Sequence, residues 1–138
     1  MRVLFAFNAF KGCLTAIEAC EAAAEVCAAM GHEVRLCPVA DGGDGTAAVI
    51  SRALQCSTVN VGVVDSIGRS QIARYGWHYE TRTAVMEMAS ASGLALLREA
   101  DRDVMRATSL GTGQMIAHAI TQKRARKILI GLGGSATV

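Results

Sequence analysis

Residues 1–54 decide the fold of this chain, and they read MRVLFAFNAFKGCLTAIEACEAAAEVCAAMGHEVRLCPVADGGDGTAAVISRAL. Thr15 and Glu18 form a capping box at the start of a helix, and Gly31 suits its end. The pattern predicts a strand, a helix, a strand, a loop and a second helix over 3–7, 16–30, 33–39, 41–45 and 46–54. This order is typical of a parallel α/β sheet, and the continuous apolar run at the start indicates a strand buried on both faces.

The pattern changes after residue 60. Three β-rich segments follow one another too closely for a helix to fit between them, which predicts an antiparallel meander. A polar stretch then precedes another helix and strand. The expected strands, helix and final strand cover 58–64, 73–79, 83–88, 111–122 and 127–131. We therefore expect the α/β class in two parts, a parallel part over 1–60 and the start of a second, mixed α/β domain over 61–138.

Composition excludes several classes of protein. Of the 138 residues, 51% are hydrophobic and 19% charged, which is typical of a globular domain. The net charge of +2 and the 4% of aromatic residues argue against nucleic acid as a partner. No stretch approaches the roughly 20 apolar residues of a membrane helix, and the first residues do not resemble a signal peptide. We expect a cytoplasmic protein with no membrane partner.

Five cysteines are present, and Cys13, Cys20 and Cys27 recur every seven residues. This spacing predicts one buried helix face, because a reduced cysteine packs as a small apolar residue. Cys37 falls in an expected strand. No C-x-x-C pair is present, which argues against a metal site, and we expect reduced thiols without a native disulfide.

Four segments carry most of the polar chemistry, and the first two lie in the parallel part. In Asn8–Gly12, Lys11 precedes a helix, so its ammonium and the helix N-terminus suit an anion; the alternative is a solvated loop lysine. In Asp41–Thr46, three glycines allow a close backbone approach, and Asp41 and Asp44 suit Mg²⁺. The alternative for that loop is a tight turn with Asp44 or Thr46 as the N-cap.

The other two segments lie in the second part. Glu87 opens the run Glu87–Gly93 at the end of an apolar strand, where a carboxylate is either functional or at an exposed edge. The related stretch Thr108–Gly113 opens a helix and suits a carboxylate or phosphate, or is ordinary capping. Gly131–Thr137 follows a buried-strand pattern and is typical of a phosphate-binding loop without a Walker A ending. Such a loop should lead into a helix, so we expect that the chain is truncated.

Together these segments resemble class I glycerate kinases over the whole chain. The motifs are, in order, Asn8-Ala-Phe-Lys-Gly-Cys-Leu14, Pro38-Val-Ala-Asp-Gly-Gly-Asp-Gly-Thr46, Glu87-Met-Ala-Ser-Ala-Ser-Gly-Leu94, Thr108-Ser-Leu-Gly-Thr-Gly113 and Gly133-Gly-Ser-Ala-Thr137. The resemblance implies a Rossmann-like domain with a second α/β domain inserted in it. It also implies that the complete protein transfers the γ-phosphate of ATP, with Mg²⁺, to D-glycerate and forms 2-phosphoglycerate.

The resemblance also implies roles for individual residues. Catalysis would rest on Lys11, Asp41 and Asp44, and the two aspartates would hold Mg²⁺ or orient the acceptor hydroxyl. Substrate and phosphate binding would involve Asn8, Gly42, Gly43, Thr46, Glu87, Ser90, Ser92, Thr108, Gly111, Thr112, Gly133, Gly134, Ser135 and Thr137.

Two departures from the family pattern affect the expected activity. Asn8 stands where the family has aspartate, and an amide is neither a general base nor a charged metal ligand. Val138 stands where the family continues with Asn-Asp. We expect the isolated chain to be inactive. The alternative is a non-catalytic truncated product, or a split subunit completed by a complementary C-terminal chain or by self-association.

Overall fold

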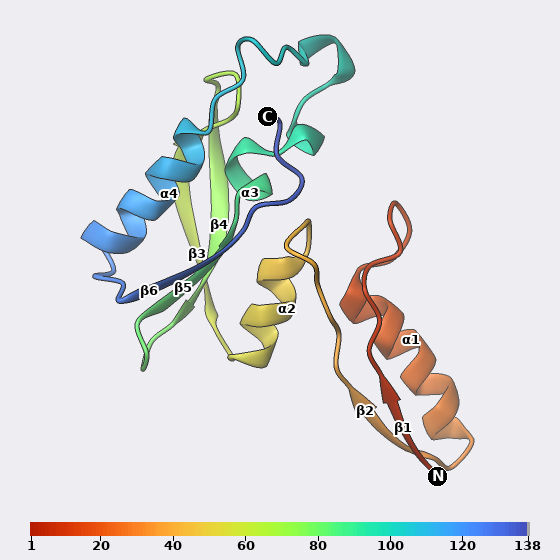
Figure 1. Cartoon of the computed structure of the whole chain (residues 1–138). Helices are drawn as coiled ribbons and strands as arrows, with labels where there is room; N and C mark the ends of the chain where they lie inside the picture. Colours follow the sequence, from red (N-terminus) through yellow and green to blue (C-terminus); the bar gives the residue numbers. More distant parts are fainter. Residues whose placement is uncertain (138) are drawn as a thin grey trace. The chain divides into compact units, whose positions relative to one another are not determined.

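The computed structural model describes residues 1–137 (Figure 1), and its internal contacts divide the chain into two units between Asp41 and Gly42. The first unit has a parallel pair of strands, and the second has a mixed sheet with helices. This confirms the predicted α/β class. The boundary expected near residue 60 concerns the domains of the complete protein and stays a prediction.

The first unit is a strand–helix–strand motif. Strand β1 (Arg2–Phe5) pairs in parallel with β2 (Glu33–Leu36), and helix α1 (Ala16–Ala29) connects them. The capping box is confirmed, because the Thr15 hydroxyl accepts from the Glu18 N–H at 3.2 Å and the Glu18 carboxylate accepts from the Thr15 N–H at 2.8 Å. These reciprocal bonds satisfy donors that the first helical turn would otherwise leave unpaired.

Strand β1 is buried on one face alone within the described residues. Val3 and Phe5 are half-buried, whereas Leu4 between them is 62% exposed. The prediction of a strand buried on both faces is therefore wrong for this chain, because a single helix covers a two-stranded sheet on one side.

The predicted cysteine face is also corrected. Only Cys20 is buried, with its thiol 3.6 Å from the Phe5 carbonyl oxygen, while Cys27 is half-buried. Cys13 is exposed because it lies in the turn before α1, and Cys37 is exposed just after β2. All five cysteines have free thiols in the structure, and their redox state in the cell stays a prediction.

The second unit is a four-stranded sheet with the order β3-β4-β5-β6. The first three strands are antiparallel neighbours, which confirms the predicted meander, and β6 is parallel to β5. The strands are β3 (Ser57–Val64), β4 (Ser70–His78), β5 (Thr83–Glu87) and β6 (Lys127–Gly131). The helices are α2 (Thr46–Ala53), α3 (Ala89–Ser92) and α4 (Leu110–Thr121), with 3₁₀ turns at Leu94–Leu96 and Glu99–Asp101.

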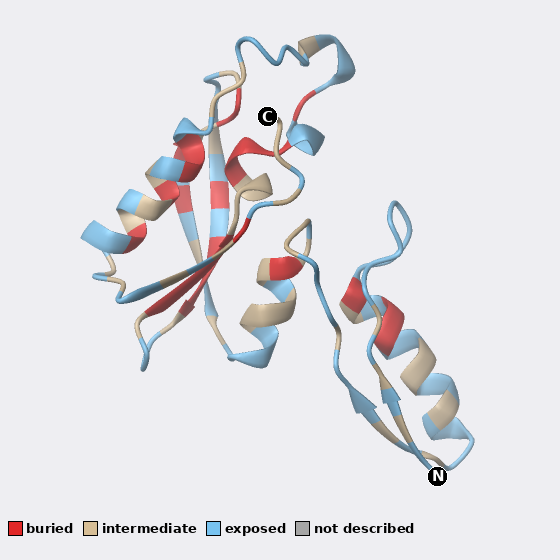
Figure 2. Ribbon diagram, viewed as in Figure 1, coloured by how far each residue is buried: buried red, intermediate tan, exposed pale blue. Residues whose placement is uncertain are grey.

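Helices cover both faces of this sheet (Figure 1). Helices α3 and α4 lie on one face and α2 on the other, against β4 and β5. The core lies between the sheet and α3–α4, and Figure 2 shows the buried residues concentrated there. The core residues are Val61, Val63, Ala73, Tyr75, Trp77, Ala84, Met86, Ala91, Met115 and Ala119. None of the helices among the described residues has the length and apolar character needed to cross a membrane.

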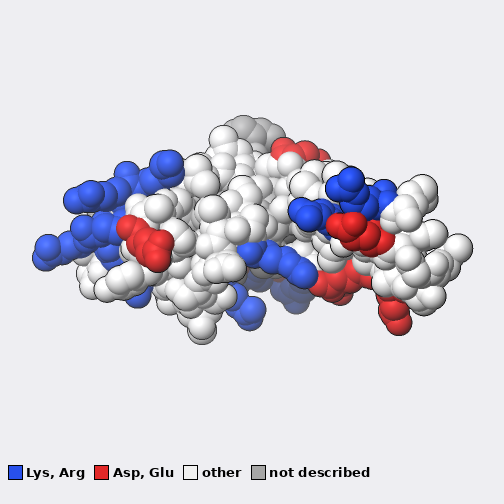
Figure 3. Space-filling view, turned by 90° about the horizontal axis from the view of Figure 1, so that it is seen from below, with Lys and Arg blue, Asp and Glu red and all other residues white. Residues whose placement is uncertain are grey.

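An ion-pair network holds the turn between β3 and β4. The buried Asp65 carboxylate accepts from Arg69 Nε at 2.6 Å, and Arg69 also contacts Asp101 at 3.1 Å. Burial raises the pKa of Asp65, but hydrogen bonds from Arg69 and from the Ile67 N–H outweigh it and hold this pKa below its ordinary value. The face of the molecule in Figure 3 carries charges of both signs, with Asp and Glu side chains among the Lys and Arg side chains.

Two glycines of α4 provide a matched test of how this helix packs against β3. A Cβ on Gly111 would overlap the Val64 carbonyl oxygen of β3, whereas a Cβ on Gly113 would meet open space. We expect Gly111→Ala to lower the free energy of unfolding by about 1–3 kcal/mol through overpacking. Gly113→Ala should leave it unchanged or raise it by up to about 1 kcal/mol, because alanine favours helix. Urea unfolding measures both, and equal effects would contradict the close approach of α4 to β3.

Candidate functional site

Three polar segments of the second unit meet at the carboxyl ends of β5 and β6. They are the glycine-rich turn before α2, the stretch that follows β5 and the loop that follows β6. The Gly133 N–H donates to the Gly42 carbonyl at 2.8 Å, and the Ala136 N–H donates to the Ser92 carbonyl at 2.8 Å. An isolated bridge joins Gly93 to Ser135. The structure therefore brings together most of the site residues predicted for this unit.

Three glycines without side chains allow the loop after β6 to lie against the turn before α2. A Cβ on Gly131 would lie 2.7 Å from the Gly42 carbonyl oxygen, and a Cβ on Gly133 would lie 2.7 Å from the Gly43 Cα. Gly134 has φ +71°, and a Cβ there would overlap the Asp44 carboxylate. At Gly131 and Gly133 the opposite contact is backbone, and at Gly134 the positive φ disfavours other residues, so glycine suits all three positions.

Thr46 closes the turn before α2 from inside. Its hydroxyl donates to the Gly43 carbonyl at 2.7 Å and accepts from the Gly42 N–H at 3.1 Å. The residue is only 8% exposed, so its hydroxyl stabilises the turn through these two hydrogen bonds. Gly45, the N-cap of α2, has φ 91° and no side chain, while the neighbouring Asp44 is exposed.

Glu87 is the half-buried carboxylate of this site. It ends β5, and its Oε1 accepts a short hydrogen bond from the Ala47 N–H in the first turn of α2. Burial raises the pKa of Glu87, the N–H groups of Ala47 and Gly45 act in the opposite direction, and the Asp44 carboxylate adds to the rise. Burial has the larger effect, although a helix N-terminus favours an ionised carboxylate.

The hydroxyls expected to bind a hydroxy acid already have partners within the protein. Ser92 Oγ and Thr112 Oγ1 are 2.9 Å apart in the core between α3 and α4, and both residues are buried. Ser90 Oγ accepts from the Arg74 N–H at 3.0 Å and donates to the Arg74 carbonyl at 3.1 Å. Thr108 Oγ1 accepts from the Leu110 N–H at 3.1 Å at the start of α4.

The remaining predicted residues, Asn8, Lys11 and Asp41, belong to the first unit. Asn8 Nδ2 donates to Asp41 Oδ2 at 3.3 Å, so the departure from the family pattern produces an amide–carboxylate pair. Lys11 is exposed in the turn before α1. The Glu18 carboxylate of the capping box already gives the N-terminus of α1 an anion of its own.

A magnesium site at Asp41 and Asp44 stays a prediction. Asp41 belongs to the first unit and Asp44 to the second. Among residues 1–137, no group of three or more His, Cys, Asp or Glu side chains lies close enough together to hold a metal ion. Two carboxylates would still suit Mg²⁺, which usually keeps several waters and binds substrate phosphates.

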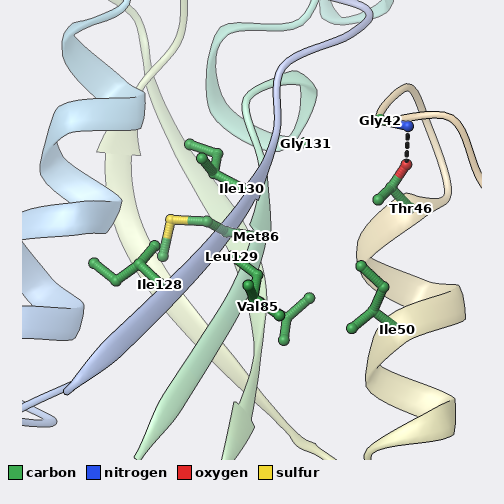
Figure 4. Close-up of a pocket in the computed structure, with 9 residues that line it drawn as sticks. All are labelled: Gly42, Thr46, Ile50, Val85, Met86, Ile128, Leu129, Ile130 and Gly131. Carbon is green, nitrogen blue, oxygen red and sulfur yellow. Dashed lines mark hydrogen bonds between the residues drawn. The ribbon is translucent and has the colours of Figure 1, made fainter.

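An apolar groove of about 310 Å³ lies beside this site (Figure 4). Ile50 of α2 faces Val85 and Leu129 of the sheet across the groove, and Gly42 and Gly131 lie at its end. Its lining is mainly apolar and carries no charged side chain.

Comparison with known proteins identifies the family. The sequence profile of the glycerate kinase family matches residues 3–138. The chain belongs to the glycerate kinase family. It is 37% identical to a glycerate kinase of Bacillus subtilis and 35% identical to the glycerate 2-kinase of Escherichia coli, in each case over 99% of this chain. A crystal structure assigned to glycerate kinase 2 of Salmonella typhimurium LT2 matches 99% of the chain with a TM-score of 0.79 and 34% identity.

This glycerate kinase family chain is short relative to those proteins. It spans 36% of the Bacillus subtilis and Escherichia coli relatives and 37% of the Salmonella chain.

Sequence reasoning missed the backbone part of the site. The Ala47 N–H, the Ala136 N–H and the Gly42 carbonyl all make contacts that join its segments. Gly42 and Ala136 lie within the predicted motifs, but the groups that join the segments are their backbone atoms, and Ala47 lies just outside those motifs. The one available signal was the density of glycine and alanine next to the polar motifs.

The buried hydroxyl pair supplies a test of the structure at this site. We expect Ser92→Ala and Thr112→Val each to lower the free energy of unfolding by about 1–3 kcal/mol, because each leaves one buried hydroxyl unpaired. The double variant should lose less than the sum by at least about 0.5 kcal/mol. Denaturant unfolding of the four proteins measures this coupling, and strictly additive losses would show that the two hydroxyls do not interact.

Proposed function

We propose that this chain supplies part of an ATP-dependent kinase that phosphorylates D-glycerate, and that the complete protein forms 2-phosphoglycerate. The observation that supports it most is the meeting of three polar segments at one edge of the sheet, within a chain of this family. The name of the Escherichia coli relative, glycerate 2-kinase, supports the position of transfer. In open α/β sheets, ligands bind outside the carboxyl ends of the strands, where these segments lie.

The proposed phosphate site is the loop Gly133–Thr137. It follows β6 directly, and Gly134 approaches the Asp44 carboxylate. Backbone N–H groups of such a loop would face the phosphates of ATP, and Gly42 and Gly43 would leave room for them. Mg²⁺, held by Asp41 and Asp44, would neutralise charge on the transferring phosphoryl group.

Binding of glycerate would then rest on the first turn of α4 and on Lys11. The hydroxyls of Ser92 and Thr112 bond to each other, so the N–H groups of Gly111 and Thr112, in the first turn of α4, are the better donors for a carboxylate. Lys11 would stabilise negative charge on glycerate or on the phosphates. Phosphoryl transfer depends chiefly on this kind of positioning and charge neutralisation.

A non-catalytic chain, or a subunit completed by another chain, is the second candidate. It is favoured by exposed apolar side chains, such as Leu4, 62% exposed, and Ile72, 70% exposed. Apolar surface of this kind promotes association with a complementary C-terminal chain or with a second copy. The cytoplasmic location, for either candidate, is part of the proposal.

The activity test uses the chain joined to the remaining part of the Bacillus subtilis relative. With ATP and Mg²⁺, we expect ADP release that depends on D-glycerate, measured by a coupled assay, and a ³¹P NMR spectrum of 2-phosphoglycerate. Another small hydroxy acid is the control substrate. ADP release with that acid and none with glycerate would refute the substrate, and a spectrum of 3-phosphoglycerate would refute the position of transfer.

The 138-residue chain alone should be inactive. Asn8 replaces a family carboxylate, and loss of one pre-organised charge or donor typically costs about 10²–10³ in rate. The 138-residue chain also lacks the aspartate that follows position 138 in the family pattern. With both groups missing, the loss should exceed about 10⁴. Single-turnover transfer from labelled ATP measures it. Turnover at ordinary kinase rates of about 1–100 s⁻¹ would contradict the expectation.

A further inference from the structure

Helix α2 begins without a capping side chain of its own. Its N-cap is Gly45, at φ 91°, and no side-chain hydrogen bond is made there. Four N–H groups at the start of any helix lack intrahelical partners and need acceptors from elsewhere. The turn before α2 carries Asp44, so whatever fixes this first helical turn also fixes the position of that carboxylate.

Glu87 supplies the missing acceptor from another element. Its Oε1 accepts the Ala47 N–H, although the two residues are 40 positions apart in sequence. Helix α2 packs on β5, and Glu87 is the last residue of that strand. A negative carboxylate is well suited to this place, because the N-terminus of a helix carries partial positive charge.

The geometry points to Glu87 as the positioning residue that holds the turn Gly42–Thr46, and with it Asp44, against the loop Gly131–Gly134. Three contacts join these parts: Glu87 to the first turn of α2, Thr46 to Gly42 and Gly43, and Gly42 to Gly133. Loosening the first of them frees the other two to shift. The catalytic consequence rests on the proposed function, but the positioning itself does not.

This role differs from direct contact with substrate or phosphate. One oxygen of Glu87 is already engaged by a backbone N–H, and the side chain is half-buried beneath the turn. A negative carboxylate also repels phosphate and glycerate, which are themselves anions. Asp44 is the exposed carboxylate of this pair, and Glu87 is the half-buried one that supports its turn.

The first experiment measures amide hydrogen exchange at Ala47 in the 138-residue chain. Glu87→Ala should accelerate exchange at Ala47 about ten- to hundredfold, the usual effect of losing a hydrogen bond to a charged group. Glu87→Gln keeps an acceptor oxygen and should restore most of the protection. Glu80→Ala removes the same charge from the exposed turn between β4 and β5 and is the matched control. Its Ala47 rate should match wild type.

Two results of that experiment would overturn the inference. One is an unchanged Ala47 rate in Glu87→Ala. The other is an equal acceleration of the amides of α2 and α4, which would show only that the whole unit is less stable. Retained protection of α4, together with a loss confined to the start of α2, supports the positioning role.

The second experiment separates positioning from substrate contact. It uses this chain joined to the remaining part of the Bacillus subtilis relative, as in the activity test. Glu87→Ala should lower kcat by about ten- to hundredfold and change the KM for glycerate little, whereas Glu87→Gln should recover most of the rate. A rise in KM at unchanged kcat would overturn the inference, because it would indicate contact with glycerate. If wild type shows no glycerate-dependent ADP release while the exchange result holds, the proposed function falls and the positioning role stands.

Discussion

The contact on which the second unit most depends is that between two glycine-rich backbones. Gly131 and Gly133 after β6 lie against Gly42 and Gly43 before α2 so closely that a single methyl group on either of the first two would separate them. The Gly133 N–H to Gly42 carbonyl bond closes this contact at 2.8 Å. The Asp44 carboxylate and the loop that follows Gly133 lie beside this contact.

Much of the fold followed from local sequence signals. The apolar runs located the strands to within a few residues, the Thr15–Glu18 pair located the start of α1, and the short spacing between β-rich segments gave the meander. These signals were sufficient because they depend on near neighbours in the chain. The burial of Leu4 and Cys13 was predicted wrongly, because burial depends on which distant elements cover a residue.

The sequence predicted which segments of the second unit meet, but it predicted much less of what their side chains do. Glycines and hydroxyls in ordered motifs identified the segments that meet at the sheet edge. Their roles depend on partners that sequence does not specify: Ser92 bonds to Thr112, Thr46 bonds within its own turn, and Glu87 reaches the N-terminus of a helix far away in sequence. A hydroxyl or carboxylate in a motif therefore marks a location, and its hydrogen bonds decide between supporting the site and binding a ligand.

Strands β4 and β5 separate after only a short run of pairing, from His78–Thr83 to Gly76–Val85. Beyond that point Ser90 takes the position of the absent strand, since its hydroxyl bonds to both the N–H and the carbonyl of Arg74. One side chain thus substitutes for a peptide group of a neighbouring strand. Strands β4 and β5 can therefore diverge here without leaving the backbone N–H and carbonyl of Arg74 unpaired. Helix α3 occupies the opening, so the chain can turn away from β5 at the sheet edge while the antiparallel and parallel halves remain one sheet.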